Sequence, residues 1–453
     1  MLAAVSLMFP YLFGLGSLLF LVCGSIKGEM RPCNDSYRLQ LLACMLVLGI
    51  ELNHSTVLLL SNLSQSLMVG CALSILGLIY FIVSRVKGLP RVISLGWLTI
   101  FISLYVACLL IVLTEPLHGW DARSIWFFHG KMIFYNAFVD AGGDWSLPSI
   151  GFSHPDYPEL IPILAAQIAF VAGYWNEYLP KLSLVALLLP AVLSLMSILR
   201  GKWWHIIFIA VPLLFTHQWL KNGYMDGYLA LYAGLATFFW GRWLDNKSQL
   251  DLISGILFLG VVLDLKNEGM LIGLIIGSLV FSFICIRISE FKTGNYVKYF
   301  EGIAFVLISM SGLFLWGRKK QILGLQNDLD LGLNSLPRIY ERLADGSLAI
   351  ILKHLYVLDH VNMSLGIFLL SLVWTLRLGR RPSNGAIFSS LVGIFYFCGI
   401  VLIYLATPFD LVTFHLPTGE RTMLPVHIML LAATLSLYRG DKEALEPSLI
   451  GTS

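Results

Sequence analysis

Residues 115–158 form one polar segment that holds a high density of potentially catalytic side chains. Asp121 and Asp156 are carboxylates that could accept a proton, and His154 is an imidazole, the side chain used most often in proton transfer. Arg123 carries a fixed positive charge on a guanidinium that fits phosphate or carboxylate groups. These residue types are suited to removing a proton from a hydroxyl group and to neutralising a nearby anion.

The first group in this segment is His118-Gly-Trp120-Asp121-Ala-Arg123, directly after an apolar run. A carboxylate at a helix start near a wet surface can act as a general base when one of its oxygens is accessible. The same position suits a helix N-cap, and Arg123 could simply pair with Asp121. The two roles are compatible, so both stay open.

The second group is His154-Pro-Asp156-Tyr157-Pro158. Its prolines favour extended backbone, which would place the side chains of His154 and Asp156 on the same side. That arrangement suits a shared proton, a metal ion or a phosphate contact. The alternative is a rigid turn that leads into the next helix.

Three further charged groups follow later in the chain. Lys221 and Asp226 lie in KNGYMDG, and Lys266 and Glu268 lie in DLKNEG. Charges this close to hydrocarbon are costly unless they are paired or hydrated, so they indicate function. The alternative is a structural ion pair of Lys266 with Asp226 or Glu268. Arg421 opens the last apolar run and could hold a phosphate with two hydrogen bonds or anchor a helix end.

Composition places these groups in a membrane protein. The 453-residue chain is 57% hydrophobic and only 13% charged, which a soluble globular protein of this length would not be. The seven cysteines are scattered without metal or redox spacing, so neither a disulfide framework nor a zinc site is expected. The first apolar run lacks a basic segment before it, as in a membrane helix with its N-terminus outside rather than a cleaved signal.

The fold class predicted from the sequence is an all-α polytopic membrane protein with about 13 transmembrane helices. The apolar runs fall near residues 4–24, 39–60, 66–84, 92–114, 179–199, 203–219, 225–241, 251–264, 268–287, 298–316, 359–376, 386–406 and 421–438. With the N-terminus outside and the C-terminus inside, 18 of the 30 lysines and arginines fall in short cytoplasmic connections, as the positive-inside rule requires. The 115–158 segment is then extracytoplasmic.

Two outer loops are longer than simple connectors and contain predicted interfacial helices. In loop 115–178, apolar residues recur at steps of three and four, which predicts an amphipathic helix that Gly142 and Gly143 end. The members of this stripe are Ile125, Phe128, Met132, Tyr135 and Val139. Residues 159–173 are apolar but short for a span, so an interfacial or re-entrant helix is predicted there. A second amphipathic helical region is predicted within 317–358.

The chain divides on this basis into four parts. Residues 1–91 hold N-terminal helices, and 92–316 hold a catalytic membrane core that includes loop 115–178. Residues 317–358 form the second outer loop, and 359–453 hold the C-terminal helices and a short cytoplasmic tail.

The motifs together resemble the GT-C superfamily of polyprenyl-phosphate-sugar-dependent glycosyltransferases, which includes the protein O-mannosyltransferases and the aminoarabinose transferases of lipid A. The similar segments, in order, are WDARSIW, HPDYPELIPIL, GYMDGYLALY, KNEGMLIGLII and ERTMLPVHIMLLAA, within residues 92–438. The chain departs from the family in having three helices before this region. Asp121 also has no acidic neighbour, where the family has an acidic pair.

The resemblance implies an enzyme that moves a sugar from a polyprenyl phosphate to an acceptor hydroxyl on a protein, lipid or glycan, with inversion at the sugar. Asp121 would accept the hydroxyl proton, and Trp120 would stack on a sugar face. Cations would stabilise the leaving phosphate. The candidate cations, in order of preference, are Lys266, Arg421, Lys221 and Arg123.

The implied substrate-binding site also includes His154, Asp156, Tyr157, Asp226 and Glu268. His154 and Asp156 would orient the acceptor or the phosphate. No cofactor is required, although Asp121, His154, Asp156 and Asp226 could bind a divalent metal. The expected partners are the lipid-linked donor, the acceptor and the bilayer of an inner or plasma membrane, with an extracytoplasmic active site and no nucleic acid.

Two other functions remain as alternatives. An O-antigen ligase or polymerase, which uses a diphosphate-linked glycan, would concentrate arginine and histidine in a late loop. Here that loop holds Arg338, Arg342, His354 and His360, whereas the acids cluster early. A secondary transporter would place ionisable residues at helix centres and show matching halves, but the charges lie mainly at predicted outer helix ends.

Overall fold

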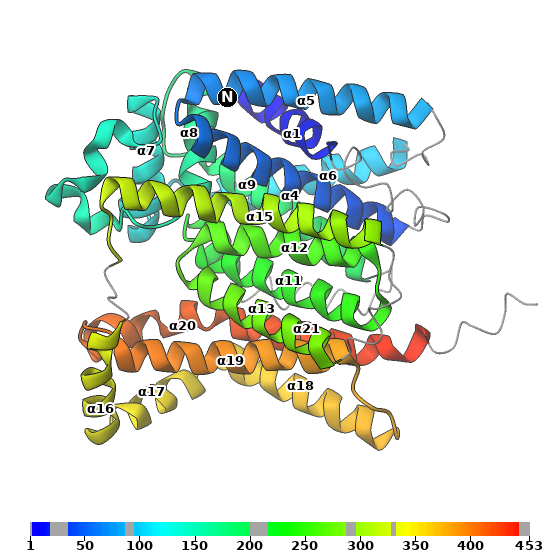
Figure 1. The fold of residues 1–453 in the computed structure, drawn as a ribbon, viewed down its shortest axis with the longest axis vertical. Coiled ribbons are helices and arrows are strands. Elements are labelled where there is room, and N and C mark those ends of the chain that lie inside the picture. Colours follow the sequence, from blue (N-terminus) through cyan, green and yellow to red (C-terminus); the bar gives the residue numbers. More distant parts are fainter. Residues whose placement is uncertain are drawn as a thin grey trace, which may run out of the picture. The chain divides into compact units, whose positions relative to one another are not determined.

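The computed structural model describes residues 2–18, 35–86, 95–199, 216–286, 296–327 and 332–443. Over these residues the chain is helical and has no strand, although one isolated bridge pairs Asn62 with Phe138 (Figure 1). The all-α class predicted from the sequence is therefore confirmed. The resemblance to the GT-C fold remains a prediction.

Seven helices within the described residues are long and apolar enough to cross a membrane. Six of them are α4 (Asp35–Leu60), α5 (Leu63–Val86), α13 (Glu268–Ile286), α15 (Tyr296–Leu323), α18 (Asp359–Arg377) and α19 (Asn384–Ala406). The seventh joins a short 3-10 turn to α9 (Leu182–Leu199). The chain is therefore a multi-pass helical membrane protein, and the finer count of thirteen spans stays a prediction.

Shorter or less apolar helices cover most of the other predicted runs. They are α1 (Leu2–Gly16), α6 (Leu95–Leu113), α11 (Asp226–Asn246), α12 (Gln249–Leu265) and α21 (Leu424–Glu443). The predicted run at 203–219 lies largely outside the described residues. In the second predicted loop, α16 (Leu336–Ala344) and α17 (Ser347–Tyr356) are helical, and no residue of α16 is buried, as an interfacial amphipathic helix requires.

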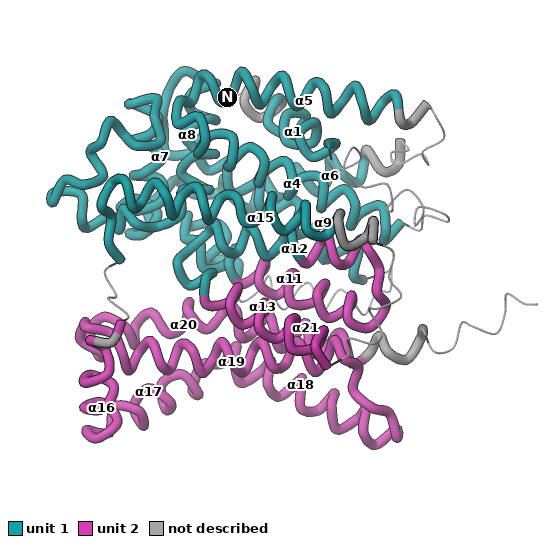
Figure 2. The backbone as a smooth tube through the Cα atoms, viewed as in Figure 1, with its two compact units in different colours: residues 1–229, 256–270, 293–328 teal, residues 230–255, 271–292, 329–453 magenta. Residues whose placement is uncertain are grey.

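The described chain forms two compact units (Figure 2). Unit 1 contains residues 1–229, 256–270 and 293–328, and unit 2 contains residues 230–255, 271–292 and 329–453. In unit 2, α19 and α18 pack on α21. In unit 1, α4 packs against α1, α5, α9 and α15, so its apolar residues are mostly buried.

The contact of α1 with α4 is close enough to require glycine. A Cβ atom at Gly16 would lie 1.7 Å from the carbonyl oxygen of Met45, and one at Gly49 would lie 2.0 Å from that of Leu12. Small residues at these positions let the two backbones approach, which is a common way to pack helices in membranes.

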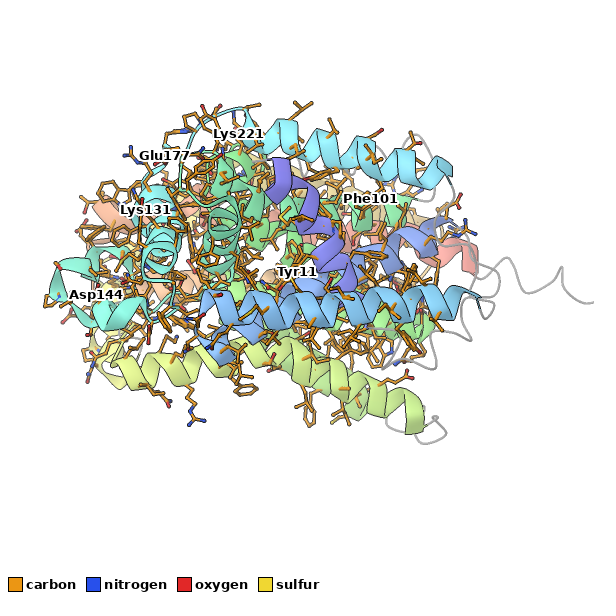
Figure 3. All side chains as sticks on the ribbon, turned by 90° about the horizontal axis from the view of Figure 1, so that it is seen from above. Tyr11, Phe101, Lys131, Asp144, Glu177 and Lys221 are labelled. Carbon is orange, nitrogen blue, oxygen red and sulfur yellow. The ribbon has the colours of Figure 1, made fainter. Side chains whose placement is uncertain are left out.

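Several connections of unit 1 meet at one end of its helices, which we call the loop end. Val139 donates a backbone hydrogen bond to Ser61 over 2.8 Å, and Leu117 donates one to Glu177 over 3.2 Å. In Figure 3 the labelled residues Lys131, Asp144, Glu177 and Lys221 lie toward this end, while Tyr11 and Phe101 lie along the helices. The charge pattern had assigned these connections to a common side of the membrane.

A small hydrophobic core fixes loop 115–158 on the helices beneath it. Trp145 is 1% exposed and donates from its indole nitrogen to the carbonyl of Val139 over 2.8 Å. The rest of this core comes from Val57, Leu58, Leu63, Ile133, Ala141, Ile150, Ile163, Ala166 and Trp316. Burial of a large apolar side chain contributes about 1.5–3 kcal/mol to the stability of the fold. The loop is therefore packed on the helices and is not a loose surface segment.

The predicted amphipathic helix over 125–139 is only partly correct. A π-helical turn, η1 (Ala122–Trp126), leads into α7 (Phe127–Asn136), which ends at Ala137 in a left-handed conformation with φ of 60°. Tyr135, assigned to the apolar stripe that faces lipid or the helix bundle, is 68% exposed within the protein. The helix stops before Gly142 because the backbone of residues 137–139 pairs with residues 61–63.

The segment predicted to form an interfacial or re-entrant helix over 159–173 is helical but does not lie at the protein surface. It forms α8 (Leu160–Ala172), and every residue from Leu160 to Ala169 is buried. Contacts with α1, α4, α5, α7 and α9 surround it. It is apolar on all faces and is therefore an interior helix rather than an amphipathic surface one.

Candidate active site at the loop end

Lys266 lies at the centre of an ion-pair network at the loop end. It sits in the turn between α12 and α13, and its Nζ lies 3.0 Å from Oδ1 of Asp226 and 3.1 Å from Oε1 of Glu268. Asp226 begins α11 and Glu268 begins α13, where carboxylates interact favourably with the helix dipole. The structural ion pair considered as an alternative in the sequence is therefore present.

Asp156 is fixed by two neighbouring elements. The side-chain amide of Asn267 donates to its Oδ2 over 2.7 Å, and the indole of Trp316 donates to its backbone carbonyl over 3.2 Å. Asp156 is only 2% exposed. The turn between α12 and α13 thus holds both Lys266 and Asp156.

Of the two geometries considered for the His154–Pro158 group, the extended one is wrong and the rigid turn is present. His154 has a left-handed backbone with φ of 52°, and its carbonyl accepts a hydrogen bond from the amide of Tyr157 over 3.0 Å. The segment is therefore a turn, in which the rings of His154 and Tyr157 stack with centroids 5.3 Å apart. The contacts of Asp156 with Asn267 and Trp316 explain why a turn is favoured over extended backbone.

Tyr157 marks the place where the acidic side chains meet. Its ring lies 5.4 Å from that of Trp126, and burial raises the pKa of its hydroxyl. The charge of Glu268 raises this pKa further, while that of Lys266 opposes the rise. Asp156 and Asp121 add smaller effects in the same direction as Glu268, so all four charged groups act on one phenol.

Asp121 is brought to this place by the packing of two loops. A Cβ atom at Gly119 would lie 2.3 Å from the ring of Tyr224, and one at Gly223 would lie 2.6 Å from Cβ of Ala122. Gly223 also has φ of +90°, which favours glycine. Asp121 stands immediately before η1, but its side chain makes no capping hydrogen bond, so the N-cap role considered from the sequence is not found.

The other candidate residues occupy different environments. Trp120 is 72% exposed, and Arg123 is exposed beside it. Lys221 donates to Oε1 of Glu115 over 2.6 Å, in a partly exposed ion pair. Arg421 lies in unit 2, on the single-turn helix α20 (Gly419–Thr422).

We call the group at the loop end the Tyr157 cluster. It consists of Asp121, Asp156, Tyr157, Asp226, Lys266 and Glu268. Four carboxylates accompany one ammonium group, so its formal charge is negative, and it can accept hydrogen bonds from hydroxyls or a proton from one of them. Within the described residues, no three histidine, cysteine, aspartate or glutamate side chains are arranged to hold a metal ion.

Sequence reasoning missed two buried polar groups of unit 1. The Nδ1 of His129 lies 2.8 Å from Oε1 of Glu159, and its Nε2 lies 3.0 Å from the carbonyl of Ser153, which ties residues 153–159 to α7. The second group joins Glu51 and His54 of α4 to Asp264 of α12. Glu51 and His54 stand out within the apolar run 39–60, which was the one signal available for them.

No known protein family, curated protein or solved structure matches the chain. The likeness to GT-C enzymes therefore depends on the sequence segments quoted above and on their order.

Proposed function

We propose that the protein is an integral-membrane glycosyltransferase that transfers a sugar from a polyprenyl-phosphate donor to an acceptor hydroxyl. One observation carries the proposal: the residues on either side of Asp121 pack on Gly223 and Tyr224, just before Asp226, whose carboxylate pairs with Lys266 at the loop end of unit 1. A carboxylate-rich, aromatic-lined site at the end of membrane helices suits a polar sugar whose carrier lies in lipid.

In this reaction Asp121 accepts the proton of the acceptor hydroxyl as its oxygen attacks the sugar C1. The bond between C1 and the phosphate oxygen breaks, and its electron pair leaves with the polyprenyl phosphate. Attack and departure on opposite faces of the sugar invert its configuration. The extracytoplasmic site that the charge pattern predicts would place both substrates at the outer leaflet.

The neighbouring side chains position the substrates. A raised pKa keeps the hydroxyl of Tyr157 protonated, so it can donate a hydrogen bond to the sugar or the acceptor. The exposed ring of Trp120 is available to stack on a sugar face. Asp156, which Asn267 holds in place, can accept a hydrogen bond from a sugar hydroxyl.

The ion pairs refine the choice of phosphate-binding cation. Lys266 is held by two carboxylates, and Lys221 by Glu115, so neither is well placed to gain a further anionic partner. Arg123 is exposed, lies two residues after Asp121 and forms no ion pair among the described residues. We therefore assign the phosphate contact in unit 1 to Arg123, and Arg421 remains the candidate from unit 2.

The test is transfer by the purified full-length chain in lipid nanodiscs. The protein is incubated with a panel of polyprenyl-phosphate sugars and an envelope extract as acceptor, and released polyprenyl phosphate is measured. We expect turnover with one donor and a loss of about 10²–10⁴-fold in Asp121→Asn, the usual contribution of a general base. Asp144→Asn changes the same residue type in the same loop and should retain activity.

The ligase alternative is weakened by the contacts of its arginines. Arg338 donates to the carbonyl of Ala406 over 2.8 Å, and Arg342 donates to that of Tyr404 over 2.6 Å. Both arginines thus satisfy carbonyls at the end of α19, the groups that a helix leaves unpaired. Such arginines support the fold of unit 2 rather than bind a diphosphate.

A proton-coupled transporter is favoured over the ligase by one observation. Glu51, His54 and Asp264 place ionisable groups in the buried interior of unit 1, where transporters hold coupling ions. Uptake of sugars or lipid-linked sugars into proteoliposomes under a proton gradient, without sugar transfer, would support this second function over the first.

A further inference from the structure

Three ionisable side chains that are not part of the Tyr157 cluster lie in the buried interior of unit 1. Glu51 and His54 lie on α4 and are 0% exposed, and Asp264 on α12 is 1% exposed. The Nδ1 of His54 lies 3.0 Å from Oδ2 of Asp264. Glu51 stands nine residues before the end of α4, which is roughly 13 Å along the helix.

Glu51 also lies against the helix that carries Asp264. A Cβ atom at Gly260 of α12 would lie 3.0 Å from Oε1 of Glu51, so the two carboxyl groups are near enough to interact. Within the described residues, neither oxygen of Glu51 accepts a hydrogen bond from an N–H or O–H group. Two ionised carboxylates are both acceptors and repel each other, so this contact is favourable only when a proton lies between them.

The charge of the surroundings leads to the same conclusion. No lysine or arginine forms an ion pair with Glu51, His54 or Asp264 in the part of the chain that the structure describes. An uncompensated charge in such an interior costs several kcal/mol. With all three groups deprotonated the site carries two negative charges, and two protons bring it to neutrality.

We propose that Glu51, His54 and Asp264 form a proton-binding site in the membrane-embedded interior, with one proton shared between the two carboxyl groups and a second on the His54–Asp264 pair. The ligand is the proton itself. The inference stands independently of the transferase proposal, because it depends on none of the residues assigned to transfer.

The packing around the three groups holds them together. A Cβ atom at Gly312 would lie 2.0 Å from Oδ2 of Asp264 and 2.7 Å from Nδ1 of His54. A Cβ atom at Gly260 would lie 3.0 Å from Oε1 of Glu51. The two glycines therefore allow α12 and α15 to close over the three side chains.

The other titratable groups near this part of α4 are few. From α1, Tyr11 donates to the side chain of Asn53 over 2.7 Å, and Asn53 in turn donates to Gln167 of α8. α5 contributes Cys71, while α8 and α9 contain no titratable side chain. α15 contributes Ser309 beside Gly260, and its glutamate, Glu301, lies eight residues away. Glu51, His54 and Asp264 are therefore the ionisable groups that form this site.

Infrared difference spectroscopy tests the proposal on the full chain in lipid nanodiscs. The spectrum of Glu51→Gln is subtracted from that of the unsubstituted protein at neutral pH, in H₂O and in D₂O. We expect the difference to contain a carboxylic-acid C=O band that shifts in D₂O. Loss of ionised-carboxylate bands instead would overturn the proposal. Glu301→Gln, the same change at another buried glutamate of unit 1, provides the control spectrum.

Reversible binding is tested on the unsubstituted protein, so it does not depend on how a variant folds. As the pH is raised while circular dichroism shows the fold intact, the D₂O-sensitive band should disappear, and it should return on reacidification. A band that persists until the protein unfolds would show a permanently held proton rather than a binding site. Failure of Glu51→Gln to fold would also count against the proposal, because glutamine has nearly the shape of the protonated acid.

Discussion

The Tyr157 cluster and the Glu51–His54–Asp264 site both bring carboxylates from different helices of unit 1 together, but they neutralise them differently. In the cluster, the ammonium group of Lys266 lies between Asp226 and Glu268, in a turn at the helix ends. At the interior site, two carboxyl groups lie near each other and near one imidazole. Among the described residues, no lysine or arginine forms an ion pair with any of these three groups. The first arrangement uses a fixed charge, and the second requires protons.

The position of each group in its helix accounts for the difference. Asp226 and Glu268 begin their helices, where unpaired backbone N–H groups and the dipole favour negative charge. Glu51 and His54 lie within α4, where backbone groups are already hydrogen-bonded. The negative charge of a carboxylate there can be compensated only by other side chains or by a proton. The site at the helix ends is thus suited to keep its charge, and the interior site to gain or lose it.

The largest effect should come from removing the fixed charge. Lys266→Met leaves the carboxylates of Asp226 and Glu268 beside each other without their cation, which typically costs about 3–5 kcal/mol. Glu51→Gln should cost much less, because it removes a proton-bearing group and adds no charge. Thermal unfolding of both variants in the same detergent measures the contrast.

Lys131→Met is the control for this pair of variants, because Lys131 is exposed and should tolerate the loss of its charge. Equal losses of stability in Lys266→Met and Glu51→Gln would remove the distinction between the two sites. That outcome would mean that Glu51, too, is ionised and depends on a compensating charge.

A smaller loss is expected from crowding the interior site. Gly312→Ala places a methyl group against Asp264 and His54, and overpacking of this kind costs about 1–3 kcal/mol. Gly317→Ala, on the same helix with no neighbouring atom within 4 Å, should instead be neutral or stabilise α15 by about 0.5–1 kcal/mol. Gly312→Ala should therefore lower the unfolding temperature and Gly317→Ala should not, and an equal loss of stability in both variants would contradict the tight packing.

Much of the fold follows from apolar patterning alone. The runs at 39–60 and 386–406 match α4 and α19 closely, because long apolar segments in a membrane must be helical to satisfy their backbone groups. The burial of α8 could not be inferred from its own residues, since an apolar helix of 13 residues suits an interface and an interior equally well. Its neighbours from five other helices decide the outcome.

The sequence indicated one pairing within the candidate site. It pointed to Lys266 with Asp226 or Glu268 as an ion pair, and the structure contains both contacts. At His154 it left extended backbone and a rigid turn open, because the choice depends on Asn267 and Trp316, more than 100 residues further along the chain. Contacts at that separation leave no periodic trace in a single sequence.

A modest effect is expected at the tryptophan that supports Asp156. Trp316→Phe keeps most of the buried ring but removes the indole N–H that donates to the carbonyl of Asp156. The expected loss is about 0.5–1.5 kcal/mol for the hydrogen bond, measured by thermal unfolding. Trp374→Phe, at a position that is 59% exposed, is the matched control and should be nearly neutral. An equal response of the two variants would show that the contact with Asp156 adds nothing to stability.

The smallest effect should come from the partly exposed ion pair of Lys221 with Glu115. The hydrogen bond from Lys221 holds the pKa of Glu115 below its usual range, although Glu115 is 37% exposed. Because the pKa is lower in the folded protein, the pair stabilises the fold above the ordinary pKa of glutamate, and this contribution is lost as the pH falls through the lowered value.

Lys221→Met should therefore lower the unfolding temperature slightly at neutral pH and low salt. The difference in unfolding temperature from the unsubstituted protein should shrink both in acid and at high ionic strength. Protonation of Glu115 removes one charge of the pair, and salt screens the attraction between the two charges. Glu177→Gln, an exposed acid on the same loop, should show neither dependence. A Lys221→Met defect that stays constant in acid and in salt would assign the role of Lys221 to packing of its side chain rather than to its charge.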